Sequence, residues 1–170
     1  MKLVRRAIGK CCHMFHTNVA KLFSERGRVL MLHWVGDEVQ DEETEPFRIS
    51  TEQCRKFLQW LKSKKTIRLE NWEKEHDFFA LTIDDVPENF YHNAYPLLEE
   101  AGIPFTLFVN VSLLDKEEFI TRKQLVEMSQ SELCTIASHG VSHGEFALLN
   151  KEQALQDLQD SKCELEQIIG

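Results

Sequence analysis

Four short apolar runs alternate along the chain with segments whose apolar positions recur at helical spacing. The runs span residues 28–34, 78–83, 105–110 and 133–137, and they are rich in β-branched and aromatic side chains. Runs of this length with so few polar positions are typical of strands that are buried on both faces, as in parallel sheets. The pattern therefore predicts a βαβαβαβα chain in which right-handed crossovers place the strands in one mostly parallel sheet.

The helices of this alternation are marked by capping boxes and by a glycine stop. A capping box pairs a small polar residue with Gln three positions later, so that two free backbone N–H groups gain acceptors at the start of a helix. The pairs are Ser50 with Gln53, Thr121 with Gln124, and Asn150 with Gln153. A further helix is expected from about residue 90 to 101, with Gly102 as its C-terminal cap.

Residues 1–27 form a separate basic segment ahead of the predicted domain of residues 28–170. Apolar residues recur in this segment at helical spacing, with Lys2, Arg5 and Arg6 among them, which predicts an amphipathic helix. Such a helix is suited to peripheral contact with an anionic membrane surface. The alternative is a helix that packs on the domain and exposes an ordinary basic face to water.

Charge, cysteine content and hydropathy narrow the class of protein. The formal net charge is −8, and residues 1–28 carry +6 of it, so the remainder holds −14 and is not suited to binding nucleic acid. The five Cys are odd in number and lack Cys-x-x-Cys spacing, which predicts reduced thiols. No apolar run reaches the roughly 18 residues of a membrane span, and no signal peptide is recognisable. The expected location is the cytoplasm, with contact to the inner face of the membrane through residues 1–27.

Two pairs of metal-binding residue types follow two of the predicted strands. Asp84 and Asp85 end one strand, and His139 and His143 follow another. Because the carboxyl ends of parallel strands lie on one rim of a sheet, these side chains are expected to meet. One carboxylate and two imidazoles leave a position open on a zinc-like ion, and the other carboxylate can accept a proton as a general base. Adjacent residues of an extended strand point to opposite sides, so the two Asp differ in role, but spacing alone does not say which is which.

The residues 82–85, Thr-Ile-Asp-Asp, and 139–143, His-Gly-Val-Ser-His, resemble the first two motifs of the polysaccharide deacetylase family, the NodB homology domain of carbohydrate esterase family 4 type. The resemblance implies that Asp84 is the catalytic base. It implies that Asp85, His139 and His143 bind a divalent metal, with zinc as the first candidate. The implied fold is α/β, a partial (β/α) barrel that resembles the N-terminal half of the distorted seven-stranded barrel of the family.

Three departures from the family pattern accompany this resemblance. Val86 stands where the family usually has Gly, and a β-branched residue is expected to resist a positive φ. Gly140 stands where Ser or Thr usually follows the first His. The later motifs, with an Arg that orients the base and a Leu-His that supplies the acid, have no counterpart before Gly170, so the domain is expected to be C-terminally incomplete.

Two functions follow, from different classes. The first is metal-dependent hydrolysis of the N-acetyl group of an N-acetylated sugar in a polysaccharide or glycan precursor. The alternative is a catalytically inactive remnant that binds glycan or metal. His33, at the end of the first run, is a candidate acid or substrate contact, although a packing role on the rim is the more ordinary one. Because four parallel strands leave edges with unpaired backbone groups, self-association is also expected.

Overall fold

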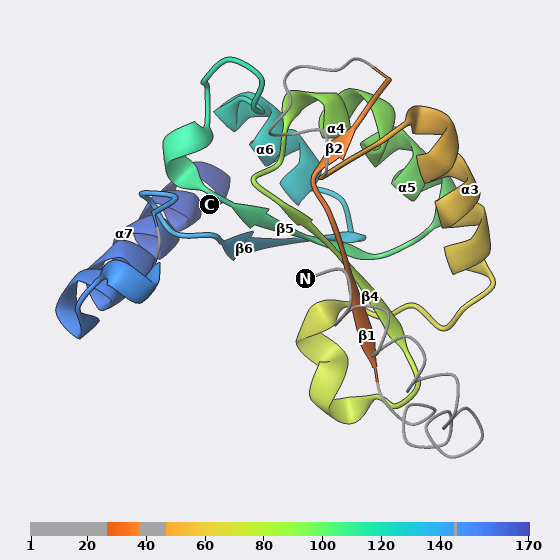
Figure 1. The fold of residues 1–170 in the computed structure, drawn as a ribbon, viewed down its shortest axis with the longest axis horizontal. Helices are drawn as coiled ribbons and strands as arrows, with labels where there is room; N and C mark the ends of the chain where they lie inside the picture. Colours follow the sequence, from red (N-terminus) through yellow and green to blue (C-terminus); the bar gives the residue numbers. More distant parts are fainter. Residues whose placement is uncertain (1–26, 38–46, 145) are drawn as a thin grey trace, which may run out of the picture.

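A four-stranded parallel sheet forms the centre of the computed structural model, which describes residues 27–37, 47–144 and 146–170. Its strands, in the order β1-β4-β5-β6, are β1 (Arg28–Leu32), β4 (Phe79–Asp84), β5 (Phe105–Val109) and β6 (Cys134–Ser138). All neighbouring strands pair in parallel, as the alternating sequence pattern predicts (Figure 1). The expected amphipathic helix of residues 1–27 lies outside the described residues except for Gly27.

The helices begin where the capping boxes place them. They are α3 (Thr51–Lys62), α4 (Glu88–Asn93), α5 (Tyr95–Ala101), α6 (Arg122–Ser129) and α7 (Lys151–Ile169), with shorter 3-10 turns η2 (Leu69–Lys74), η3 (Val111–Leu113) and η4 (Phe146–Leu148). Ser50, Thr121 and Asn150 each accept a hydrogen bond from the backbone N–H of the Gln three residues on, and that Gln side chain accepts one in return. The sequence predictions for these three helix starts are therefore confirmed.

The single helix expected over residues 90–101 is divided in two. The division falls at Ala94, between α4 and α5, and Pro96 occupies the first turn of α5. A proline has no backbone N–H and its ring crowds the preceding turn, so a continuous helix through this point is disfavoured. Gly102 ends α5 with φ of 67°, as expected of a left-handed C-terminal cap.

The first apolar run is also shorter as a strand than predicted. β1 ends at Leu32, and after His33 the chain enters β2 (Trp34–Val35), which pairs with β3 (Arg48–Ile49) in a separate two-stranded sheet. The side chain of Asn89 accepts a hydrogen bond from the Val35 N–H at 3.2 Å, and Asn93 donates to the Val35 carbonyl at 2.8 Å. Side chains of helix α4 thus bind both backbone groups of Val35, in place of a partner strand in the main sheet.

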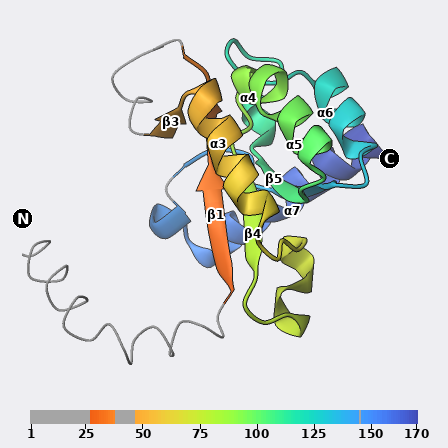
Figure 2. The same cartoon turned by 90° about the vertical axis from the view of Figure 1, so that its right-hand side faces the viewer.

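The core lies between the sheet and the helices α3 to α6, which gather on one side of it (Figures 1 and 2). Leu81, Ile83, Phe105 and Leu107 face this layer and are at most 2% exposed. Helix α7 lies alongside β6 and contacts it. None of the helices in the described part of the chain combines the length and hydropathy that a bilayer span requires.

Thiol reactivity provides a test of this packing. Burial raises the pKa of Cys54 to about 11 and that of Cys134 to about 12, whereas Cys163 is exposed on α7. Because the thiolate is the reactive form, we expect Cys54 and Cys134 to be alkylated at pH 8 at least about 100-fold more slowly than Cys163. Peptide-resolved mass spectrometry measures the three rates separately. Equal labelling of Cys134 and Cys163 in the native protein would contradict this packing of β6.

Candidate metal centre

Strand β5 aligns the two halves of the candidate site. The Asp85 N–H donates to the Phe108 carbonyl at 3.1 Å, on one side of β5, and the His139 N–H donates to the Val109 carbonyl at 2.9 Å, on the other. Asp85 directly follows β4, and His139 directly follows β6. The two polar segments therefore leave the sheet at the same level, although 53 residues separate the start of one from the start of the other in the chain.

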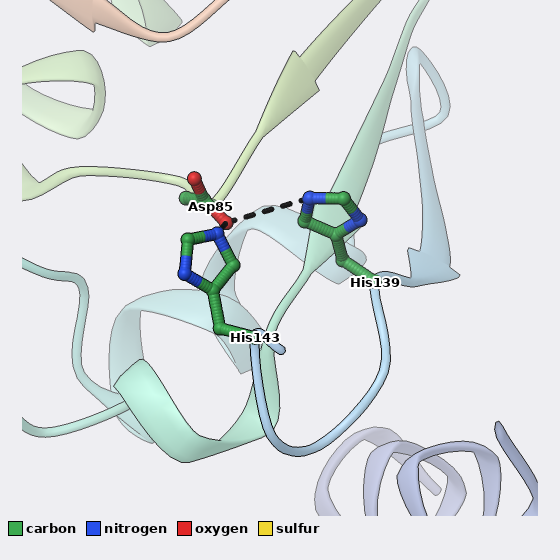
Figure 3. A group of neighbouring side chains, drawn as sticks. All are labelled: Asp85, His139 and His143. Atoms are coloured by element: carbon green, nitrogen blue, oxygen red, sulfur yellow. Dashed lines mark ion pairs between the residues drawn. The ribbon is translucent and has the colours of Figure 1, made fainter. Parts of the chain in front are cut away.

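Asp85, His139 and His143 come together above the end of β5 (Figure 3). The Nε2 atoms of His143 and His139 lie 3.1 and 3.6 Å from Asp85 Oδ1. One ligand atom from each residue lies within 4.8 Å of the others. The Asp85 side chain is 16% exposed, while the His139 and His143 side chains are 37% and 50% exposed, so the carboxylate forms the floor of the cluster and the imidazoles form its open side.

The unsatisfied carboxylate tests whether these residues fit a metal. Asp85 Oδ1 is buried, and although both imidazoles are within ion-pair distance, neither makes a hydrogen bond to it. A buried acceptor without a partner costs about 1–3 kcal/mol, so it is rarely left without a compensating ligand. A cation among the three atoms would satisfy this oxygen and use both ring nitrogens. One carboxylate and two imidazoles suit zinc and leave a coordination position open.

The chain turns sharply at Asp85 and Val86. Both have positive φ, 60° for Asp85 and 52° for Val86, and the Val86 N–H donates to the Asp84 carbonyl at 2.7 Å. The expectation that Val86 would resist this conformation is wrong. Its side chain is fully buried and its carbonyl accepts from the Ile120 N–H at 3.3 Å, so packing and hydrogen bonding offset a backbone cost of about 1–3 kcal/mol.

This turn also differs from the extended strand that the sequence predicts through Asp84 and Asp85. Asp84 is the last residue of β4, and Asp85 is already outside the extended strand. The alternation of side chains along an extended strand therefore does not apply to this pair, and the candidate metal-binding group contains Asp85 but not Asp84. The different roles expected for Asp84 and Asp85 therefore rest on the turn that Val86 completes.

Burial and the charges of neighbouring side chains both act on the carboxyl of Asp84. Burial raises the pKa of its carboxyl above the ordinary value, while the nearby charges of His139 and His33 lower it and Asp85 raises it. A carboxylate whose pKa is raised toward neutrality takes up a proton more readily than an ordinary one. The charge of His33 acts on Asp84, and its ring lies 5.3 Å from that of Phe47. His33 does not belong to the candidate metal-binding group.

Residues that sequence reasoning missed hold the loop between the two His. Ser138 Oγ accepts from the Gly140 N–H at 3.0 Å, and Asp157 on α7 accepts from the Val141 and Ser142 N–H groups at 2.8 and 3.1 Å. Gly140 has φ of 80°, and a Cβ there would lie 2.5 Å from Asp157 Oδ2, which explains why a side chain is absent at this position. The sequence shows only that Asp157 and Ser161 are four apart on the last helix, which places them on one face but does not report their contact with the loop.

The two imidazoles open into a cleft of about 440 Å³. Its other lining residues are Ser138, Gly144, Phe146 and Leu158. Phe146 and Leu158 are 38% and 44% exposed, so apolar surface borders the cluster. A ligand that reached the open metal position would contact both imidazole and apolar groups.

Comparison with known proteins identifies the family. The sequence model described as polysaccharide deacetylase matches residues 72–170, more than half of the chain, and the chain therefore belongs to this family. It is 30% identical over 129 residues to the poly-beta-1,6-N-acetyl-D-glucosamine N-deacetylase of Staphylococcus aureus strain COL, an alignment covering 68% of this chain and 44% of that protein. The chain spans less than half the length of the curated relatives that it matches.

Solved structures show the same fold. The Streptococcus pyogenes deacetylase PplD, solved in complex with acetate, superposes with a TM-score of 0.71 at 22% identity, covering 83% of this chain and 68% of that chain. IcaB from Ammonifex degensii superposes with a TM-score of 0.73 at 20% identity, covering 86% of this chain and 70% of that chain. The predicted fold class, an α/β chain that forms part of a deacetylase barrel, is confirmed.

Replacement of a single imidazole tests the metal cluster. We expect His139→Ala to lower bound zinc from about one equivalent per chain to below about 0.2, because two remaining ligands hold zinc much less tightly than three. Atomic emission after gel filtration measures the content. The matched control is His92→Ala, since His92 is exposed on α4, where it contacts Glu88 and Tyr91, and lies outside the candidate metal-binding group. Unchanged zinc in His139→Ala, or equal loss in His92→Ala, would contradict the assignment.

Proposed function

We propose that this chain carries the metal and base residues of a carbohydrate deacetylase that hydrolyses the N-acetyl group of an N-acetylated sugar. The observation that carries the proposal is the convergence of Asp85, His139 and His143 around one buried, unsatisfied carboxylate oxygen. Membership of the polysaccharide deacetylase family supports the reaction class. The rest of the proposal concerns what each side chain does.

The proposed ligands are Asp85, His139 and His143. A divalent ion, with zinc preferred, supplies Lewis-acid polarisation of a carbonyl and lowers the pKa of a water molecule when it is bound. Both imidazoles must be neutral to bind it, and Asp85 must be ionised. The buried position of Asp85 and the partial exposure of both His keep one side of the site accessible to substrate.

Asp84 is the proposed general base. It accepts a proton from the attacking water as the water oxygen adds to the amide carbon. The C–N bond then breaks as the amide nitrogen takes up a proton, either the one held by Asp84 or one from an acid such as His33, and acetate and an amine are released. The partly buried position of Asp84, which raises its pKa, favours transient protonation during this reaction. His33 is the proposed acid or substrate contact, since its charge lowers the pKa of Asp84 and the two residues are therefore neighbours in the site.

The proposed substrate is an N-acetylated glycan. The Staphylococcus aureus relative is named for action on poly-beta-1,6-N-acetyl-D-glucosamine, and this chain shares 30% identity with it over the aligned residues. Phe146 and Leu158 add apolar surface beside His139 and His143, of the kind that packs against the face of a sugar ring. Oligomers of N-acetylglucosamine are therefore the first substrates to test.

Removal of the base separates chemistry from metal binding. We expect Asp84→Asn to retain zinc and to release acetate at least about 100-fold more slowly than the parent, because a positioned base typically contributes a factor of 10²–10⁴. An enzyme-coupled acetate assay on N-acetylglucosamine oligomers measures the rate. Glu88→Gln makes the same charge change four residues away on an exposed side chain and is expected to keep the parent rate.

Two results would contradict this function. Acetate release by Asp84→Asn at the parent rate would remove Asp84 from the role of base. A parent protein that binds one zinc but releases no acetate from any oligomer tested would overturn the deacetylase assignment and support the alternative of a chain that binds metal or glycan without catalysis.

A further inference from the structure

Every backbone N–H between the two candidate His ligands has a side-chain acceptor. The Gly140 N–H donates to Ser138 Oγ at 3.0 Å. The next two N–H groups donate to the two oxygens of one carboxylate, Val141 to Asp157 Oδ2 at 2.8 Å and Ser142 to Asp157 Oδ1 at 3.1 Å. Surface loops can leave such groups to water, whereas all three interior N–H groups of this loop have fixed acceptors.

The loop is shaped to receive this carboxylate. Successive N–H groups that point to one side, next to a residue in the left-handed region, make a concave anion site, and here Gly140 has φ of 80°. Asp157 approaches so closely that a Cβ on Gly140 would lie 2.5 Å from Oδ2. The side chain is therefore seated in the loop, and it reaches both N–H groups at once from one side of α7.

Helix α7 reinforces the contact one turn further along. Ser161 is fully buried, and its Oγ lies 2.7 Å from Ser138 Oγ, the same atom that accepts from Gly140. Asp157 and Ser161 are four residues apart and so lie on one face of the helix. Together they connect α7 to the residue before His139 and to the residues between His139 and His143.

The helix itself is anchored by other contacts. Leu165 is 4% exposed in the core, and Glu164 accepts a hydrogen bond from Arg122 of α6 at 2.5 Å. The loss of Asp157 therefore leaves α7 attached to the domain through Leu165 and Glu164. The loss of Asp157 is expected to affect the loop, where the N–H groups of Val141 and Ser142 would lose their acceptor.

We propose that Asp157 is a positioning residue that presets the His139–His143 loop so that both imidazoles face Asp85, and that it thereby sets the affinity of the metal site. The inference rests on the proposed metal site. Ligands held in place before binding lose less conformational freedom when the ion arrives. Side chains that orient metal ligands typically contribute a factor of 10–100 to metal affinity.

The experiment compares Asp157→Asn with Asp160→Asn. Asn is close in size to Asp, but it has one carbonyl oxygen in place of two carboxylate oxygens, so one of the two loop N–H groups would face an NH₂ donor. Asp160 lies on the same helix, is exposed, and accepts a hydrogen bond from Gln156, so its variant removes the same charge without removing a bond to the loop. Chelator competition gives the zinc dissociation constant of each protein.

We expect zinc to bind at least about 10-fold more weakly to Asp157→Asn than to the parent, with Asp160→Asn within about twofold. The visible spectrum of the cobalt-substituted protein, which reports ligand geometry, is expected to change in Asp157→Asn and to stay unchanged in Asp160→Asn. Ser161→Ala, a small change inside the helix, is expected to weaken zinc in the same direction by about threefold. This second variant keeps the test decisive if Asp157→Asn does not fold.

The outcomes separate this inference from the proposed function. If the parent binds no zinc, the metal site itself is wrong and the inference fails with it. If the parent binds zinc and Asp157→Asn or Ser161→Ala binds it equally well with an unchanged cobalt spectrum, the inference alone is overturned. Equal weakening by Asp157→Asn and Asp160→Asn would also overturn it, since net charge would then account for the effect.

Discussion

Two carbonyl groups at the end of β5 determine where the candidate site forms. Phe108 accepts the N–H of Asp85 from one neighbouring strand, and Val109 accepts the N–H of His139 from the other. These bonds continue the parallel ladders by one residue beyond the strands, so a slip of register on either side would move a ligand by a whole residue and to the other face. The burial of Leu107 and Ile83 in the helical layer fixes that register, and the placement of the candidate metal ligands follows from it.

The local strain beside the site depends on the same core. Asp85 and Val86 both occupy the left-handed region, which costs a β-branched residue more than most. Val86 remains there because its side chain is buried with Phe90 and Leu114 in the hydrophobic cluster. Burial of Val86 in the core thus stabilises the turn. The turn places Asp85 near the two His, while Asp84 remains the last residue of β4.

Much of the architecture was predictable because it is local. The apolar runs predicted all four strands of the sheet, and Ser50, Thr121 and Asn150 located three helix starts through capping chemistry that acts within one turn. The division of the helix at Ala94 depends on Pro96. The end of β1 before His33 depends on contacts with side chains of α4. The spacing of apolar residues contains neither piece of information. Asp157 was missed for a similar reason: its importance comes from contact with a loop 15 residues away, and a solvated helix carboxylate looks the same in the sequence.

X-ray absorption at the zinc edge of the metal-loaded protein tests the central claim most directly. The ligand set of Asp85, His139 and His143 predicts a first shell of nitrogen and oxygen at about 2.0–2.2 Å, with the outer-shell scattering of two imidazole rings and no sulfur. In His139→Ala the imidazole contribution should fall to that of one ring. A shell that contains sulfur at about 2.3 Å, or one without imidazole scattering, would contradict the account, because the metal would then be bound elsewhere in the chain.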